Sequence, residues 1–135
     1  MKKEFIPYEQ ALALKELGFE EPCLAFYDGD KTEQVYFNAL RNASGDYEPF
    51  KNKERLKWFG VPLYRQSFRW FREKHNLISS VISIFKDETK TNFEYWYYIF
   101  QKEDEETFYN TYEEAELACL VKLIEIVKNK LVGFN

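Results

Sequence analysis

The residues from which small active sites are usually assembled are scarce in this chain. Its 135 residues include one histidine, two cysteines and five glycines. A zinc or redox site needs several His or Cys ligands in paired spacings, whereas His75 stands alone and Cys23 and Cys119 are far apart. The glycines are scattered and form no phosphate-binding loop. We therefore expect no catalytic residues, no metal site and no cofactor.

Long apolar runs are missing as well. A membrane-spanning helix needs roughly 18 or more consecutive apolar residues, and no segment of this length is apolar. The first residues, Met1 to Glu4, do not lead into the apolar stretch of a signal peptide. We expect a cytoplasmic protein with no membrane partner, in which Cys23 and Cys119 are reduced core residues because each lies in an apolar run.

Aromatic residues, in contrast, are abundant. They make up 19% of the chain, while hydrophobic residues make up 45% and charged residues 31%, which is a globular composition. A chain of this length forms one domain and buries roughly two-thirds of the surface that its unfolded form exposes. We predict a single domain over residues 1–135 with many ring-to-ring contacts in its core.

The net charge of −4 conceals a basic segment. Residues 51–75 hold eight Lys or Arg against two Glu, a local charge of +6, so the rest of the chain carries −10. The acidic residues gather at 103–106 and 113–116, and such runs are usually solvated surface. The basic segment is the one part of the chain whose charge suits an anionic partner.

Hydrophobic periodicity predicts an α+β fold in the order α-ββ-α-ββ-α. Pro7 and Gly18 bracket the first helix, and Thr111 with Glu114 has the spacing of a capping box. We predict helices at 7–17, 62–75 and 111–130 and hairpins at 23–39 and 78–100, with a long irregular connection at about 40–60. The simplest arrangement is a four-stranded antiparallel sheet backed by helices.

The strand at 93–100 is aromatic at nearly every position. Because side chains alternate along a strand, its rings fall on two opposite faces. One face carries Phe93, Tyr95, Tyr97 and Ile99, and the other carries Trp96, Tyr98 and Phe100. Helices on one side of a sheet can bury only one of these faces. The face of Trp96, Tyr98 and Phe100 must be covered by the 40–60 segment, by another subunit or by a ligand.

Arg65, Arg69 and Arg72 form a stripe on the helix predicted at 62–75, because they are spaced four and three residues apart. Arginines arranged in this way can hold phosphates or acidic protein surfaces with forked hydrogen bonds. The alternative is a solvated face whose arginines pair with the acidic segment at 103–106.

Three segments also resemble a known family. They are FIPYEQA at 5–11 with EPC at 21–23, WFREK at 70–74, and TYEEA at 111–115 continuing to Lys128. These segments resemble a family of short uncharacterised proteins encoded by Bacteroides-group bacteria and their phages. The resemblance implies a phage or mobile-element accessory protein, and it implies no activity or site residues.

The leading interpretation is a non-catalytic binding or protein-interaction module. Aromatic and arginine side chains are enriched at the centres of interfaces, and here they are Arg65, Arg69, Arg72, Trp58, Trp96, Tyr98 and Phe100. The partner would be another protein or a second copy in a homodimer. The alternative is a nucleic-acid-binding protein that uses segment 51–75 for phosphates and Trp58, Tyr64 or Trp70 for base stacking. A small enzyme of unknown class is the third interpretation.

Overall fold

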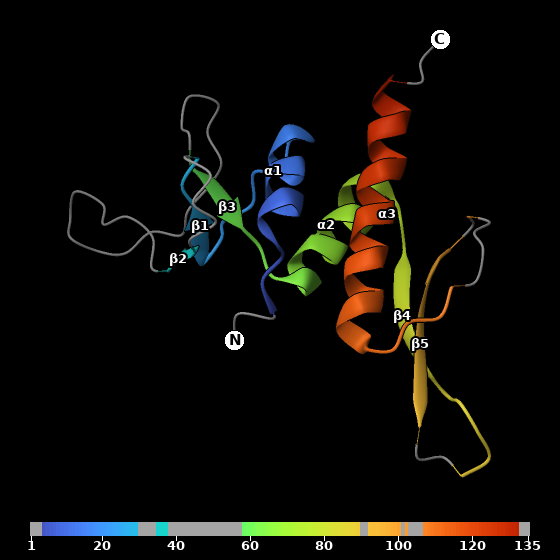
Figure 1. Cartoon of the computed structure of the whole chain (residues 1–135). Helices are drawn as coiled ribbons and strands as arrows, with labels where there is room; N and C mark the ends of the chain where they lie inside the picture. Colours follow the sequence, from blue (N-terminus) through green and yellow to red (C-terminus); the bar gives the residue numbers. More distant parts are fainter. Residues whose placement is uncertain are drawn as a thin grey trace. The chain divides into compact units, whose positions relative to one another are not determined.

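The fold is α+β, with three helices and two small antiparallel sheets in the part of the chain that the structure describes (Figure 1). The structure is a computed structural model and describes residues 4–29, 35–37, 58–89, 92–100, 102 and 107–132. The elements are α1 (Tyr8–Glu16), β1 (Ala25–Tyr27), β2 (Val35–Phe37), β3 (Phe59–Val61), α2 (Tyr64–His75), β4 (Ser79–Phe85), β5 (Phe93–Ile99) and α3 (Tyr112–Val132). The chain divides into two compact units, Met1–Gln66 and Ser67–Asn135.

The predicted four-stranded sheet is wrong. The described strands form a three-stranded sheet in the order β2-β1-β3 and a separate two-stranded sheet of β4 and β5. The additional strand is β3, which begins at Phe59, inside the stretch predicted as an irregular connection, and pairs antiparallel with β1. Glycine weakens a strand, so the run that contains Gly60 was predicted to be part of an irregular connection. In the structure, Gly60 lies directly opposite Phe26 in the pairing of β3 with β1. The rest of that connection, up to residue 57, lies outside the described residues.

Helix α1 confirms the prediction for 7–17 and ends in a Schellman motif. Gly18 has a φ of +94° and donates its N–H to the Lys15 carbonyl, while Phe19 donates to the Leu14 carbonyl at 2.9 Å. Glycine adopts this left-handed conformation without steric cost, which allows the chain to leave the helix sharply. Phe19 and Leu14, which hold the two positions where an apolar contact frequently accompanies this motif, are both fully buried.

Tyr8 anchors α1 on the three-stranded sheet. Its ring lies edge-on to the ring of Tyr27 on β1 and to that of Phe59 on β3, with both centroid separations at 5.1 Å. Such edge-to-face pairs add to the free energy that burial itself provides. Helix α2 begins at Tyr64 and not at the predicted 62, because residues 62 and 63 are held extended: Ile6 N–H donates to the Pro62 carbonyl and Leu63 bridges to Phe5.

The β4–β5 hairpin confirms the prediction for 78–100. The strands pair antiparallel from Ser79 opposite Ile99 to Phe85 opposite Phe93. Helix α3 begins where the capping pattern predicts, since the Thr111 hydroxyl oxygen accepts a hydrogen bond from the Glu114 N–H at 3.1 Å. It contacts both strands and buries one apolar side along its length: Ala115, Cys119, Leu120, Leu123, Ile124 and Val127.

Both cysteines are free and buried, as expected from the apolar runs that hold them. Burial raises the pKa of Cys23 and of Cys119 to about 12, with a smaller contribution from nearby glutamates. Thiols in this state are protonated at neutral pH and are poor nucleophiles. The two residues therefore act as small core side chains.

Candidate functional site

The two faces of the β4–β5 hairpin differ in what covers them. Helix α3 lies on the face of the odd-numbered residues, where the ring centroids of Tyr95 and Tyr112 are 6.2 Å apart. Ile99 on this face is buried. The opposite face, called the outer face below, carries the side chains of Ile78, Ser80, Ile82, Ile84, Glu94, Trp96, Tyr98 and Phe100.

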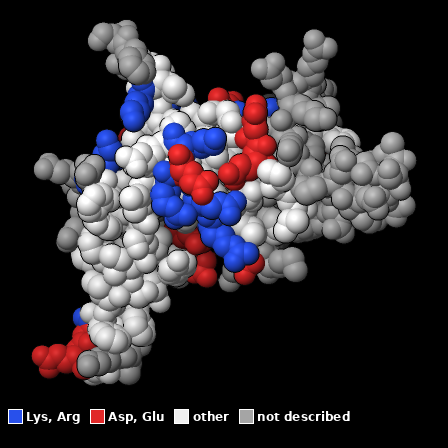
Figure 2. Space-filling view, turned by 180° about the vertical axis from the view of Figure 1, so that it is seen from behind, with Lys and Arg blue, Asp and Glu red and all other residues white. Residues whose placement is uncertain are grey.

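The outer face brings together the three aromatic residues that the alternation assigned to it. The Trp96 and Tyr98 rings are 6.3 Å apart, and the Tyr98 and Phe100 rings are 6.4 Å apart. Tyr98 is 41% exposed and Phe100 50% exposed, while Trp96 is half-buried opposite Ile82 on β4. Figure 2 shows the hairpin as a broad uncharged surface, with charged side chains only at its tip.

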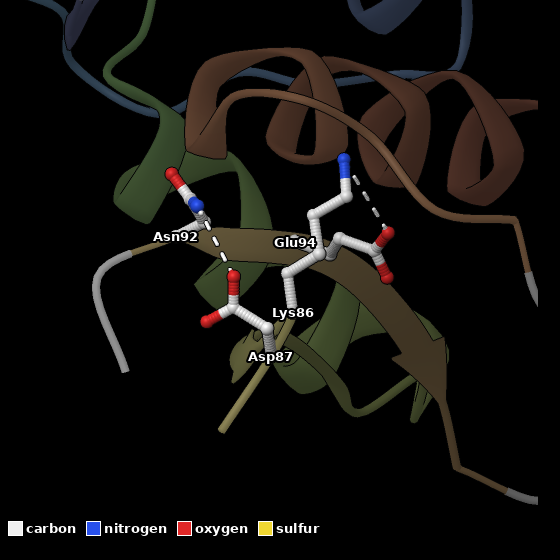
Figure 3. A network of polar contacts seen from close by, with 4 residues as sticks. All are labelled: Lys86, Asp87, Asn92 and Glu94. Atoms are coloured by element: carbon white, nitrogen blue, oxygen red, sulfur yellow. Dashed lines mark hydrogen bonds and ion pairs between the residues drawn. The ribbon is translucent and has the colours of Figure 1, made fainter. Parts of the chain in front are cut away.

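The charged groups of the hairpin lie at its turn. Lys86 is 4.0 Å from the Glu94 carboxylate, and Asp87 accepts a hydrogen bond from the Asn92 side chain (Figure 3). Asp87 also accepts a hydrogen bond from the Thr89 N–H at 3.1 Å. An aspartate that accepts from the N–H two residues on closes an Asx turn. The outer face is therefore apolar from Ile78 to the middle of the hairpin, its charged residues Lys86 and Glu94 lie near the turn as an ion pair, and the turn itself holds the acidic residues Asp87 and Glu88.

The arginine stripe lies on α2, and Arg65, Arg69 and Arg72 are all exposed. The opposite side of the helix is buried through Trp70 and Phe71, whose rings pack edge-on at 5.0 Å. The acidic segment proposed as the partner of the stripe, 103–106, lies outside the described residues. The exposure of these arginines on α2 is compatible both with binding to an anionic partner and with a solvated face that pairs with the acidic segment.

Trp58 belongs to the first compact unit and ends a row of three stacked rings. Phe26 on β1 stacks on Tyr36 of β2 at 5.4 Å and on Trp58 at 5.2 Å, with both interplanar angles at or below 25°. Trp58 is 37% exposed. Because Gly60 opposite Phe26 has no side chain, the indole of Trp58 can lie against the Phe26 ring. Phe26 and Tyr36 were not among the expected site residues, although alternation along the 23–27 and 34–39 runs would have placed them on one face.

The two other rings proposed for base stacking are not accessible. Tyr64 is 8% exposed and Trp70 is 4% exposed. A base cannot stack on a ring whose faces are already covered by protein, so only Trp58 of the three could serve in this way.

The titratable side chains do not converge on a catalytic arrangement in the described part of the chain. His75 packs edge-on against Trp70 at 4.9 Å, and burial, with a smaller contribution from Lys130, lowers its pKa. Burial and the neighbouring Glu113 raise the pKa of Glu116 to about 7. Among residues 4–29, 35–37, 58–89, 92–100, 102 and 107–132, no three His, Cys, Asp or Glu side chains are grouped so that they could hold a metal ion.

No helix within the described ranges combines the length and the apolar character needed to cross a membrane. Comparison with protein-family models, with curated protein sequences and with solved structures found no match.

Proposed function

We propose that this chain is a non-catalytic protein-binding module whose binding surface is the outer face of the β4–β5 hairpin. The supporting observation is the exposure of Tyr98 and Phe100 beside Trp96 on a face that α3 does not cover. The resemblance to proteins of Bacteroides-group bacteria and their phages adds an origin, that of a phage or mobile-element accessory protein.

The composition of this face suits protein association. Soluble monomers rarely keep large contiguous apolar patches in water, and aromatic side chains near the centre of an interface contribute the largest share of binding free energy. A partner with a complementary apolar surface would cover the Tyr98 and Phe100 rings and the exposed flank of Trp96. Since the Tyr98 and Phe100 rings are uncharged and the charged residues of this face, Lys86 and Glu94, pair with each other near the turn, we expect this binding to depend little on salt concentration.

The test is affinity capture from a lysate of a Bacteroides-group bacterium, followed by mass spectrometry. The bait is the wild-type chain, the double variant Tyr98→Lys with Phe100→Lys, or the control Leu24→Lys. Leu24 is 65% exposed and belongs to the Met1–Gln66 unit and not to the hairpin, so the control changes an accessible apolar side chain that is not part of the outer face. A protein retained by the wild type and the control but lost with the double variant would support the proposal. Equal recovery with all three baits would contradict it.

A second candidate, nucleic-acid binding, is favoured by the three exposed arginines of α2 and by Trp58 at the end of its ring row. Binding through arginines to phosphates would weaken steeply with rising salt. Titration with a labelled single-stranded oligonucleotide at low and at high salt separates the two candidates. Salt-sensitive binding that is lost in the triple variant Arg65→Ala, Arg69→Ala, Arg72→Ala would favour this second function.

A further inference from the structure

The backbone groups of β4 point alternately toward β5 and away from it. At the two ends of the hairpin, Phe100 N–H donates to the Ile78 carbonyl at 2.7 Å and Lys86 N–H donates to the Asn92 carbonyl at 2.9 Å. In an antiparallel pair, residues that exchange such bonds alternate with residues whose N–H and C=O point outward. All four residues here have even numbers, so the odd-numbered residues of β4 direct their backbone groups away from β5.

The far edge of β5 obeys the same alternation and is partly occupied. Tyr95, an odd-numbered residue, donates its N–H to the Tyr109 carbonyl at 3.0 Å and accepts the Tyr109 N–H at 2.7 Å. Beside the free edge of β4, however, the described part of the chain places no strand (Figure 1). The outward N–H and C=O groups of Val81 and Ser83 lie along this edge.

The sequence of β4 lacks the features that usually prevent a sheet edge from pairing with another strand. Natural sheets prevent edge-to-edge pairing with charged side chains, prolines, bulges or very short strands. β4 is seven residues long, reads SSVISIF and contains no charge and no proline. Three of its residues are β-branched Val or Ile, which favour extended pairing, and the first charge, Lys86, follows the strand.

We propose that β4 pairs antiparallel with β4 of a second copy of this chain, so that two hairpins form one continuous sheet. Only pairings of odd with odd residues let the outward groups meet. The register centred on Ile82 places Val81 of each copy opposite Ser83 of the other, and Ile82 faces its own counterpart across the two-fold axis. Because β4 carries no charge, this symmetric pairing brings no like charges together.

The pairing also extends the surface proposed for partner binding. Antiparallel partners place opposite residues on the same face of a sheet, so Ile82 of the two copies would join their outer faces into one apolar surface. The inference does not depend on the outer face being a binding site, because it uses the backbone edge of β4 and not the aromatic rings.

The experiment combines sedimentation velocity with amide hydrogen exchange on the full chain across a range of concentrations. We expect a dimer at the higher concentrations. The N–H groups of Ser80 and Ile82 bond within the hairpin and should stay protected at every concentration, whereas those of Val81 and Ser83 should become protected only when the dimer forms. A chain that remains monomeric throughout, or a dimer in which Val81 and Ser83 stay unprotected, would overturn the proposal.

Substitutions at Ser83 test whether two copies associate through the edge of β4 or through the outer face. Ser83→Pro removes an N–H that the hairpin does not use, so the strand should persist, while the dimer loses that bond in both copies. We expect the dissociation constant to rise at least about tenfold. Ser83→Ala keeps the N–H and should leave the dimer unchanged, and Ser83→Lys, which charges the edge without altering the backbone, should weaken it as the proline does.

The face variant Tyr98→Lys is the matched comparison. It should preserve the dimer, because the Tyr98 side chain lies on the outer face and not at the β4 edge. If Tyr98→Lys dissociates the dimer while Ser83→Pro and Ser83→Lys do not, the copies associate through the face and edge pairing is wrong. Failure of the proposed partner binding would instead appear only in the capture experiment.

Discussion

The N-terminus of α3 depends on one side-chain hydrogen bond, and replacing Thr111 with Ala removes it. The Thr111 hydroxyl oxygen accepts the N–H of Glu114 at 3.1 Å, which satisfies one of the donors that the first turn of a helix leaves unpaired. The helix itself should persist, because the Ala115 N–H donates to the Thr111 backbone carbonyl, which the substitution retains.

The magnitude follows from the exposure of this site. N-cap substitutions of this kind cost about 0.5–2 kcal/mol. Thr111 is exposed, so water can replace the lost oxygen, and the free energy of unfolding should fall by about 1 kcal/mol. For a chain of this size the melting temperature should then fall by about 4 °C.

Thermal unfolding followed by far-ultraviolet circular dichroism measures this change, and Thr111→Ser is the control because it keeps the hydroxyl oxygen. Amide exchange adds a local measurement, in which the Glu114 N–H should exchange faster in Thr111→Ala alone. If Thr111→Ala melts with the wild type and the Glu114 amide exchanges at an unchanged rate, the hydrogen bond does not stabilise α3 and the reasoning is wrong.

Three further predictions concern α1, α2 and α3. Gly18→Ala should destabilise the chain by about 1–2 kcal/mol, because a φ of +94° disfavours any residue with a Cβ, although a Cβ at Gly18 would meet no atom within 4 Å. Gly18→Asn should cost less than Gly18→Ala. Equal urea unfolding midpoints for the wild type and Gly18→Ala would contradict the left-handed conformation of Gly18. Burial raises the pKa of Glu116 from 4.5 to about 7, so this carboxyl favours folding while protonated and the free energy of unfolding should fall as pH rises from about 4.5 through about 7. Glu116→Gln should remove that part of the pH dependence in denaturation series, and an unchanged slope would contradict it. The triple change of Arg65, Arg69 and Arg72 to Ala should shift the urea midpoint little, since exposed ion pairs contribute about 0–1 kcal/mol each; a large loss would show that the stripe is structural.

Local sequence signals predicted the helices and the second hairpin well. Pro7, Gly18 and Thr111 act through hydrogen bonds and backbone preferences that span only a few residues, so the bounds of α1 and the start of α3 can be read without the rest of the chain. The strict alternation along β5 likewise separated Trp96, Tyr98 and Phe100 from Tyr95 and Tyr97 before any packing was known.

Pairing and burial, in contrast, depend on residues that are distant in the sequence. β1 pairs with β3 across a long stretch of chain, and no local pattern marks Phe59–Val61 as its partner, because strand pairing is selected by side-chain packing and free backbone groups. Tyr64 and Trp70 looked suitable for stacking on bases, but packing in the folded chain buries both. Alternation also separated the two faces of β5 without indicating which one α3 covers. The contact of the Tyr112 ring at the start of α3 with the Tyr95 ring settles that choice, because only the folded chain brings these two residues together.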